Sequence, residues 1–373
     1  MKRRASHDSG GTNKRSLYHD KPLKSYSTSS YSSEDEGHLY ARAGDVLHSR
    51  YEVISVMGTG TFGKVFACND RKHRDIVAIK VIRSIKRYIE SSLIEADILS
   101  YVAEQQTKSK VHHFVKLYSK FYTSSGHLGL VFEPLGISLY DLVKKNGYVG
   151  LPLSQVKSVS YQLLHAMSFL HSINLIHTDL KLENILFVSN NFTKSLQNNG
   201  SQVLIPVDPS IKIIDFGGAT YDDKHKSTII STRQYRGPEV TLESGWSFPS
   251  DIWSIGCMIA EIYDGDLLFP THDDLEHLCL IEKFLGIEEY SSSMLKKSPI
   301  RHRFFDSNNT LRFSDLSTKS KRLVHDMKSI DNYFNIQNGD NKSGIVELTR
   351  ELLRFDPEKR IAADKALKMS FFL

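Results

Sequence analysis

The chain has 373 residues, of which 40% are hydrophobic and 24% are charged, a balance typical of globular proteins that excludes wholesale disorder. The length favours two lobes or about two domains over one small core. The net charge of +5 permits phosphate-bearing partners and gives no sign of a nucleic-acid binder. The three cysteines (Cys68, Cys257 and Cys279) are too few for a disulfide framework and lack metal-ligand spacing.

Residues 1–44 have a composition unlike the rest of the chain. Ser25–Ser33 reads SYSTSSYSS, and large aliphatic residues are nearly absent from the segment, so we predict a disordered tail. Two basic clusters, at residues 2–4 and 14–15, fit either a nuclear import signal or a solvated tail. We find no secretory signal and no membrane-spanning run, so we expect a soluble intracellular protein without a membrane partner.

From residue 45 onward the pattern is strand-rich at first and helix-rich later. Strands are predicted at 51–56, 64–68, 76–82 and 128–133, and a helix at 88–102. After Pro152 the apolar spacing turns helical, with long segments at 154–172 and 250–263. This order predicts an α+β fold of two unlike lobes. Two polar stretches, 188–210 and 287–343, are expected to be surface loops or short hairpins.

A glycine-rich string lies between the first two predicted strands. It has the pattern GxGxxGxV and runs from Gly58 to Val65. Glycines let main-chain N–H groups approach phosphate oxygens, but a dinucleotide-binding fold needs a helix after the first strand, not a second strand. Lys80 ends the next apolar strand, where burial requires a counter-charge. Nucleotide phosphates together with Glu95 on the following helix would supply it.

Two further clusters carry polar side chains suited to phosphate transfer. The first, HTDLKLEN, spans His177 to Asn184, and the second is the DFG triplet at Asp215. Asp179 can accept the proton of an attacking hydroxyl, and Lys181 can neutralise charge on a transferring phosphoryl group. Asn184 and Asp215 offer oxygen ligands of the kind that Mg²⁺ uses together with phosphates.

With these motifs in this order, residues 45–373 resemble a eukaryotic protein kinase. The resemblance implies a bilobal fold, with a small antiparallel β-rich N-lobe with one main helix at about 45–134 and a larger, mostly helical C-lobe at about 135–373. It implies ATP and Mg²⁺ as cofactors, Asp179 as catalytic base, and Asn184 and Asp215 as metal ligands. Lys80, paired with Glu95, would contact the phosphates. The expected ATP-binding residues are Met57, Gly58, Thr59, Gly60, Thr61, Phe62, Gly63, Lys64, Val65, Ala78, Lys80, Phe132, Glu133 and Leu135.

The resemblance also assigns three structural residues. Asp251 would brace the catalytic loop, and Glu239 would pair with Arg360 in the large lobe. The adenine ring would hydrogen-bond to the backbone of Glu133 and Leu135.

Four stretches resemble the narrower LAMMER, or CLK, family within the CMGC kinases. They are HTD at 177–179, STRQYRGPE at 231–239, FPTHD at 269–273 and EHLCLIEKFLG at 276–286, which is similar to the family's name motif. The family is dual-specific, so the resemblance implies Ser/Thr substrates, Tyr autophosphorylation, arginine/serine-rich splicing factors as protein partners and a nuclear location. The insertion at 188–210 lies where this family has a hairpin.

Thr178 replaces the arginine that in most kinases pairs with a phosphate on the activation loop. We therefore hypothesise that activity does not require such a phosphate, although residues of the activation segment could still tune it. Those residues are Ser227, Thr228, Ser231, Thr232 and Arg236. Two alternatives stay open: another CMGC kinase, either DYRK-like or proline-directed, and a pseudokinase scaffold that binds ATP without turnover.

Overall fold

The structure is a computed structural model that describes residues 37–109, 111–197, 200–223, 227–287, 290–334 and 342–373. All of them belong to the unit Tyr31–Leu373. Most of the predicted disordered tail, residues 1–36, lies outside the described residues. No helix in the described part combines the length and the apolar character that crossing a bilayer requires.

The strands are β1 (Val46–Leu47), β2 (Tyr51–Gly60), β3 (Gly63–Asp70), β4 (Asp75–Ile82), β5 (Leu117–Tyr122), β6 (Leu128–Phe132), β7 (Leu175–Ile176), β8 (Ile185–Phe187), β9 (Phe192–Leu196), β10 (Gln202–Pro206), β11 (Ile211–Ile213) and β12 (Thr220–Tyr221). The α-helices are α1 (Lys86–Ser109), α2 (Leu139–Lys145), α3 (Leu153–Ser172), α4 (Pro238–Thr241), α5 (Pro249–Asp264), α6 (Asp274–Leu285), α7 (Ser292–Lys297), α8 (Thr318–Asp326), α9 (Ile330–Tyr333), α10 (Lys342–Leu352) and α11 (Ala363–Ala366). Short 3-10 turns are η1 (Leu182–Asn184), η2 (Arg233–Tyr235), η3 (Arg301–Arg303), η4 (Phe313–Asp315) and η5 (Pro357–Lys359).

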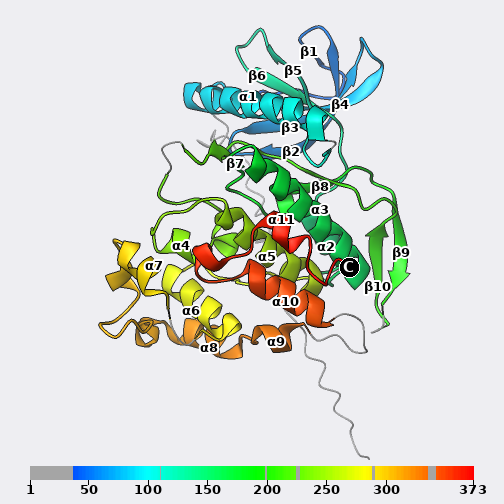
Figure 1. Cartoon of the computed structure of the whole chain (residues 1–373). Helices are drawn as coiled ribbons and strands as arrows, with labels where there is room; N and C mark the ends of the chain where they lie inside the picture. Colours follow the sequence, from blue (N-terminus) through cyan, green and yellow to red (C-terminus); the bar gives the residue numbers. More distant parts are fainter. Residues whose placement is uncertain (1–36, 110, 198–199, 224–226, 288–289, 335–341) are drawn as a thin grey trace, which may run out of the picture. The chain divides into compact units, whose positions relative to one another are not determined.

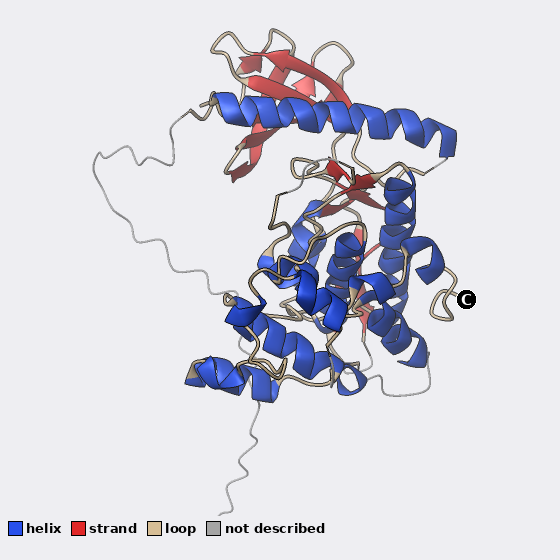
Figure 2. Ribbon diagram, turned by 60° about the vertical axis from the view of Figure 1, so that its left-hand side comes forward, coloured by secondary structure: helices blue, strands red, loops and turns tan. Residues whose placement is uncertain are grey.

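The N-lobe is a six-stranded antiparallel sheet in the order β1-β2-β3-β4-β6-β5. Figures 1 and 2 both show α1 lying along one side of this sheet. Ala96 of α1 packs there against Ile82, Leu128 and Leu130, all buried. The strands predicted at 51–56, 64–68, 76–82 and 128–133 and the helix predicted at 88–102 are all present, as β2, β3, β4, β6 and α1.

The C-lobe is built around α3 and α5, whose buried faces share one large core. Its centre includes Trp253 and Met258 of α5, both fully buried. Helix α5 begins with Pro249 and ends at Gly265, which has a φ of 94° and so needs a residue without a Cβ. The two long helices predicted after Pro152 are confirmed, and the α+β arrangement is as expected.

Residues 37–44 correct the predicted end of the tail. The Gly37 carbonyl oxygen accepts hydrogen bonds from the backbone N–H of Ser84, at 2.9 Å, and from Nε2 of His127, at 3.1 Å. Leu39 and Ala41 pack on the buried cluster of the sheet. The expectation of disorder up to residue 44 is thus wrong for these eight residues, because a few apolar side chains among polar ones were enough to dock the segment.

The two predicted insertions differ in form. Residues 192–206 pair as the antiparallel hairpin β9–β10, with Phe192 opposite Pro206. The stretch 287–343 was expected to form loops or hairpins, but its described part contains the short helices α7, α8 and α9. Its side chains Leu295, Phe304 and Phe305 are buried in the main core. Helices of four to nine residues are too short to show a clear apolar period, which explains the difference.

Candidate active site

The glycine-rich turn joins β2 to β3. A Cβ added at Gly58 or Gly60 would meet no atom within 4 Å, and neither residue has a positive φ. At Gly63 a Cβ would lie 2.1 Å from the carbonyl oxygen of Val81. The close approach of β3 and β4 therefore requires Gly63, whereas packing within the chain requires no glycine at the first two positions. Their bare backbone leaves room for phosphate oxygens to reach main-chain N–H groups.

Strand pairing brings several predicted ATP-binding residues together. Val65 on β3 lies opposite Lys80 on β4, and Ala78 on β4 lies opposite Phe132 on β6. The side chain of Met57, just before the first glycine, is exposed. These residues come from neighbouring positions on four strands, so a nucleotide beneath the turn could contact them all.

Other residues of the turn contact the protein around it. Thr59 lies opposite Lys64 in the β2–β3 pairing, and the Lys64 ammonium is 4.5 Å from the ring centroid of Tyr40. The ring of Phe62 meets Tyr88 of α1 edge-on, with centroids 5.3 Å apart. The turn is thereby tied to both α1 and the docked segment 37–44.

The segment after β6 presents free main-chain groups. The N–H of Glu133 donates to the carbonyl oxygen of Lys116, and its carboxylate pairs with Lys212 at 3.1 Å. In contrast, the carbonyl oxygen of Glu133 and the N–H of Leu135 have no hydrogen bond to any described residue. A free acceptor and a free donor two residues apart fit the expected adenine contacts.

Lys80 is the most constrained charged group of the site. Its Nζ donates to both carboxylate oxygens of Glu95, at 3.0 and 2.9 Å, and lies 3.4 Å from Oδ1 of Asp215. Burial alone would lower the pKa of Lys80, but the charges of Glu95 and Asp215 outweigh it and raise the pKa. Asp215 has a φ of 64°, an uncommon conformation for a residue other than glycine. The lysine therefore stays charged and joins the two lobes.

Asp179 is held through both of its carboxylate oxygens. Lys181 Nζ donates to Oδ2 at 2.6 Å, and the N–H and hydroxyl of Thr232 donate to Oδ1 at 3.1 and 2.8 Å. The Asn184 side chain donates to the Asp179 carbonyl oxygen at 2.9 Å. Burial raises the pKa of Asp179, but these donors, Lys181 first, outweigh burial and lower it. The carboxylate is consequently ionised and fixed in orientation.

Asp251 of α5 sets the shape of the loop before Asp179. Its carboxylate accepts the backbone N–H groups of His177 and Thr178, both at 2.9 Å, and Nε2 of His171 at 3.0 Å. Thr178 has a φ of 71°, so the loop is strained there and these bonds hold it. Burial opposes the charge on Asp251, yet the bond from His171 and the other donors lower its pKa overall.

Neutral and charged contacts within the chain hold the described part of the activation segment. Arg236 donates through Nε to the carbonyl oxygen of Ile230 and through Nη2 to that of Ser231, at 3.0 and 2.9 Å. The Ser231 hydroxyl donates to the carbonyl oxygen of Thr178, and the Trp246 indole donates to that of Ser227. Thr228, by contrast, is exposed. Residues 224–226 lie outside the described residues.

Glu239 and Arg360 form a fully buried ion pair. The guanidinium donates to both carboxylate oxygens, at 2.7 and 2.9 Å, and neither side chain has any exposed surface. Arg360 also donates to the carbonyl oxygens of Pro249 and Arg354. The pair therefore anchors α4, directly after the activation segment, to the end of the C-lobe.

The sequence also matches known proteins. The description "protein kinase domain" fits residues 51–372. The chain is 38% identical over 349 residues to the dual specificity protein kinase CLK1 of Homo sapiens, which covers 92% of this chain and 70% of that protein. The serine/threonine-protein kinase AFC2 of Arabidopsis thaliana is also 38% identical over 349 residues, 91% of this chain and 80% of that protein. This chain is a protein kinase of the CLK family.

A solved structure confirms the kinase fold. The crystal structure of another kinase domain has a TM-score of 0.82 and 33% sequence identity, and the match covers 90% of this chain and 99% of that one. The fold class and the phosphotransferase activity predicted from the motifs are both confirmed.

Two residues of this kinase, Asp274 and His171, were not singled out from the sequence. Asp274, at the start of the name-motif helix α6, accepts a hydrogen bond from Arg233 and lies 3.8 Å from Arg236. His171 braces Asp251 from the end of α3. No local pattern marks either contact, because the partners are 38 to 80 positions apart. The one available signal was the DxxEHL string around Asp274, which is typical of the start of a helix and so places the Asp274 carboxylate in the first turn.

Proposed function

We propose that this kinase transfers the γ-phosphate of ATP to serine and threonine of arginine/serine-rich proteins, and to its own tyrosines. ATP-dependent phosphotransfer follows from the family. Dual specificity is part of the name of CLK1. One observation supports the proposal above all: Lys181 and Thr232 hold an ionised Asp179. The same chain also contains the Lys80–Glu95–Asp215 cluster.

We assign the chemical roles as follows. The hydroxyl oxygen of the substrate attacks the γ-phosphorus, the bond to ADP breaks, and the hydroxyl proton passes to the Asp179 carboxylate. Lys181 stabilises negative charge on the transferring group, since its ammonium already lies 2.6 Å from Asp179. Lys80 binds the phosphates of ATP, oriented by Glu95. Thr232 keeps the Asp179 carboxylate pointed in one direction.

The residues present fit a magnesium ion bound together with phosphates. The Asp215 side chain is 38% exposed, and the Asn184 amide donates its NH₂ to Asp179, which leaves its carbonyl oxygen for a cation. Mg²⁺ commonly takes one or two protein oxygens and completes its shell with phosphates and water. The described residues contain no group of three His, Cys, Asp or Glu side chains that could hold a metal without other ligands. When bound, the ion would neutralise phosphate charge.

Acidic groups beside the catalytic loop support arginine-bearing substrates. Desolvation raises the pKa of Glu183, and the negative charges of Asp179 and Asp141 raise it further, while Lys181 opposes the shift. A substrate guanidinium bound beside these three carboxyl groups would reduce the repulsion between them. Splicing factors of this composition would place the kinase in the nucleus, which a fluorescent fusion of the full chain would report.

We also propose that no activation-loop phosphate is required. Arg236 and Trp246 already hold the carbonyl oxygens of the described segment, and Thr178 cannot form the bidentate pair with a phosphate that an arginine forms. Treatment with a phosphatase should leave at least half of the activity on a peptide. The same should hold for the double variant Ser227→Ala/Thr228→Ala, and abolished activity in either case would contradict the proposal.

The test of function is a phosphotransfer assay with Mg²⁺-ATP on two peptides, one of arginine/serine repeats and one proline-directed. The wild type should phosphorylate the first, and Asp179→Asn should lose at least a hundredfold in rate. Asp97→Asn, an exposed carboxylate on α1, is the matched control and should retain full activity. Preference for the proline-directed peptide would reject the substrate class, and bound ATP without transfer to any peptide would reject catalysis.

A further inference from the structure

A basic depression lies in the insertion after α6, between α7 and the residues that follow η3. Its volume is 640 Å³. The residues of its wall that matter here are Leu295, Lys296, Arg301, His302, Phe305 and Arg312. Leu295 and Phe305 are buried and supply an apolar floor, whereas Lys296, His302 and Arg312 are exposed at the rim.

The cations of this depression are only partly neutralised. Lys296 and Arg301 form no ion pair with any residue in the described part of the chain. Arg312 pairs through Nε with Asp315 at 2.7 Å, and its Nη1 contacts the carbonyl oxygen of His302 at 3.4 Å. Two full positive charges therefore face the depression without a partner.

The wall contains one acidic side chain, Asp306, and its charge is engaged elsewhere. Oδ1 of Asp306 accepts the backbone N–H groups of Asn308 and Thr310, at 2.8 and 2.9 Å, and so closes the adjacent turn. Asp315 neutralises Arg312, so Lys296 and Arg301 against Asp306 leave a net charge of +1 with His302 neutral. An anionic group is the ligand that such a wall favours.

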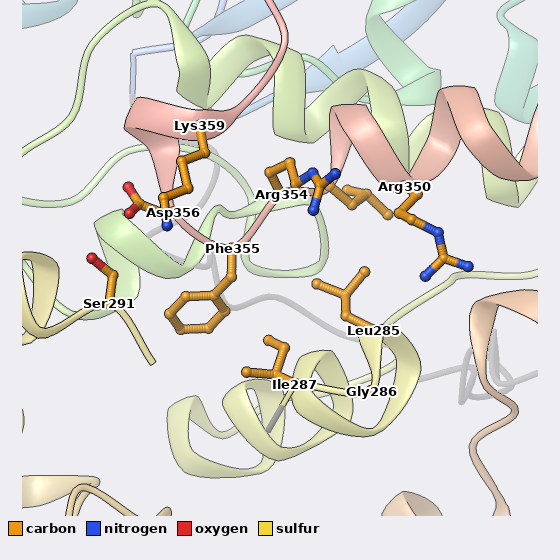
Figure 3. Close-up of a pocket in the computed structure, with 10 residues that line it drawn as sticks. Leu285, Gly286, Ile287, Ser291, Arg350, Arg354, Phe355, Asp356 and Lys359 are labelled. Atoms are coloured by element: carbon orange, nitrogen blue, oxygen red, sulfur yellow. The ribbon is translucent and has the colours of Figure 1, made fainter. Parts of the chain in front are cut away.

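A second cavity in the same lobe, of 280 Å³, offers a comparison (Figure 3). It also carries arginines above an apolar side chain, Phe355. Its Arg350, however, pairs with Asp331, and its Arg354 pairs with Glu351. Both arginines therefore have carboxylate partners, and only Lys359 of this wall has no ion pair with a described residue, whereas the basic depression has two such cations.

We propose that the basic depression binds phosphoserine in an arginine/serine-rich peptide, an inference that rests on the substrate class proposed above. Before phosphorylation such a repeat is cationic and is repelled by the wall. Each phosphate adds between about −1.5 and −2 charges, so the phosphorylated repeat becomes anionic. The Arg301 guanidinium can take two phosphate oxygens at once, and the volume suits a short peptide segment.

The consequence is a site that distinguishes product from substrate. The active site, with its acidic Glu183 and Asp141, favours the unphosphorylated repeat, and the basic depression favours the phosphorylated one. A peptide with many serines would stay attached through its already phosphorylated segment while another serine enters the active site. Retention of this kind raises the effective concentration of the remaining serines.

The test is fluorescence anisotropy on the full chain with one arginine/serine octapeptide made in two forms, unmodified and serine-phosphorylated. Arg301→Glu should weaken binding of the phosphopeptide at least tenfold, as expected for loss of charged hydrogen bonds. Lys296→Glu, at the exposed rim, is a second variant that should weaken binding in the same direction. Lys319→Glu on α8, the same charge change outside the depression, should bind like wild type.

The outcomes separate this proposal from the proposed activity. Equal affinity of wild type and both depression variants for the phosphopeptide would overturn the site. Stronger binding of an RNA octamer, lost in the same variants, would also overturn it in favour of nucleic acid. All three variants should phosphorylate a peptide with a single serine at the wild-type rate. If the wild type fails to phosphorylate any arginine/serine peptide yet binds the phosphopeptide through Arg301, only the proposed substrate is wrong.

Discussion

Replacing Glu239 with glutamine should destabilise this kinase severely. The carboxylate accepts two bonds from Arg360, at 2.7 and 2.9 Å, and both side chains are completely buried. Glutamine keeps the shape but removes the charge that neutralises the guanidinium. A buried charge left without its partner costs about 3–5 kcal/mol of unfolding free energy. The carbonyl oxygens of Pro249 and Arg354 accept from the guanidinium but cannot neutralise it.

This loss converts to a measurable shift in melting temperature. Unfolding entropy of about 2.1 cal/mol/K per residue, over roughly 330 folded residues, gives about 0.7 kcal/mol/K. Glu239→Gln should therefore melt about 4–7 °C below wild type in scanning calorimetry at neutral pH. Glu104→Gln removes an exposed carboxylate that pairs with Lys108, and it should shift the melt by no more than about 1 °C. A Glu239→Gln melt within about 1 °C of wild type would refute the reasoning.

Three further outcomes follow from the same geometry. Lys80→Met should cut the phosphotransfer rate at least a hundredfold in the peptide assay, and it should also lower the melting temperature because it leaves the buried Glu95 without its counter-charge. Gly60→Ala should leave the melting temperature unchanged but raise KM for ATP. Gly63→Ala should lower the melting temperature, because its Cβ would lie 2.1 Å from the Val81 carbonyl oxygen. A lower melting temperature for Gly60→Ala than for Gly63→Ala would contradict the glycine assignment. Burial and nearby arginines lower the pKa of His277 to about 3, so near neutral pH protons bind it only in the unfolded chain. The free energy of unfolding therefore falls as pH drops below about 6.5. Denaturant titrations should show that His277→Phe removes about 2 kcal/mol of the stability lost between pH 7 and 5.

Much of the fold followed from periodicity and motif order. The strand carrying Lys80 alternates buried and partly buried residues, and the apolar face of α1 is regular, so both elements were predictable. The order of glycine turn, lysine, acidic helix, HTD and DFG indicated the kinase family and the residues that we propose for catalysis. These signals are local, because each motif needs only a few neighbouring residues to be recognised.

What the sequence could not supply are contacts between distant residues with no pattern of their own. His171 was unremarkable on the polar edge of α3, yet it supports Asp251. Thr232 was placed in the activation segment, but its two bonds to Asp179 depend on how the chain returns to the loop. The helices of the 287–343 stretch were missed because each is stabilised by packing of a few residues such as Phe305 rather than by its own period.

The cluster around Lys80 has a consequence for the order in which ligands arrive. One ammonium and two carboxylates, Glu95 and Asp215, sum to a charge of −1 at the place where phosphates would bind. A bare nucleotide, itself strongly anionic, meets repulsion from Asp215 before it can reach the lysine. Asp215 would hold the divalent cation of a metal-bound nucleotide, which would neutralise this repulsion and leave Lys80 available to the phosphates. We therefore expect the pairing of Lys80 with Asp215 to favour the metal-bound nucleotide over the free one.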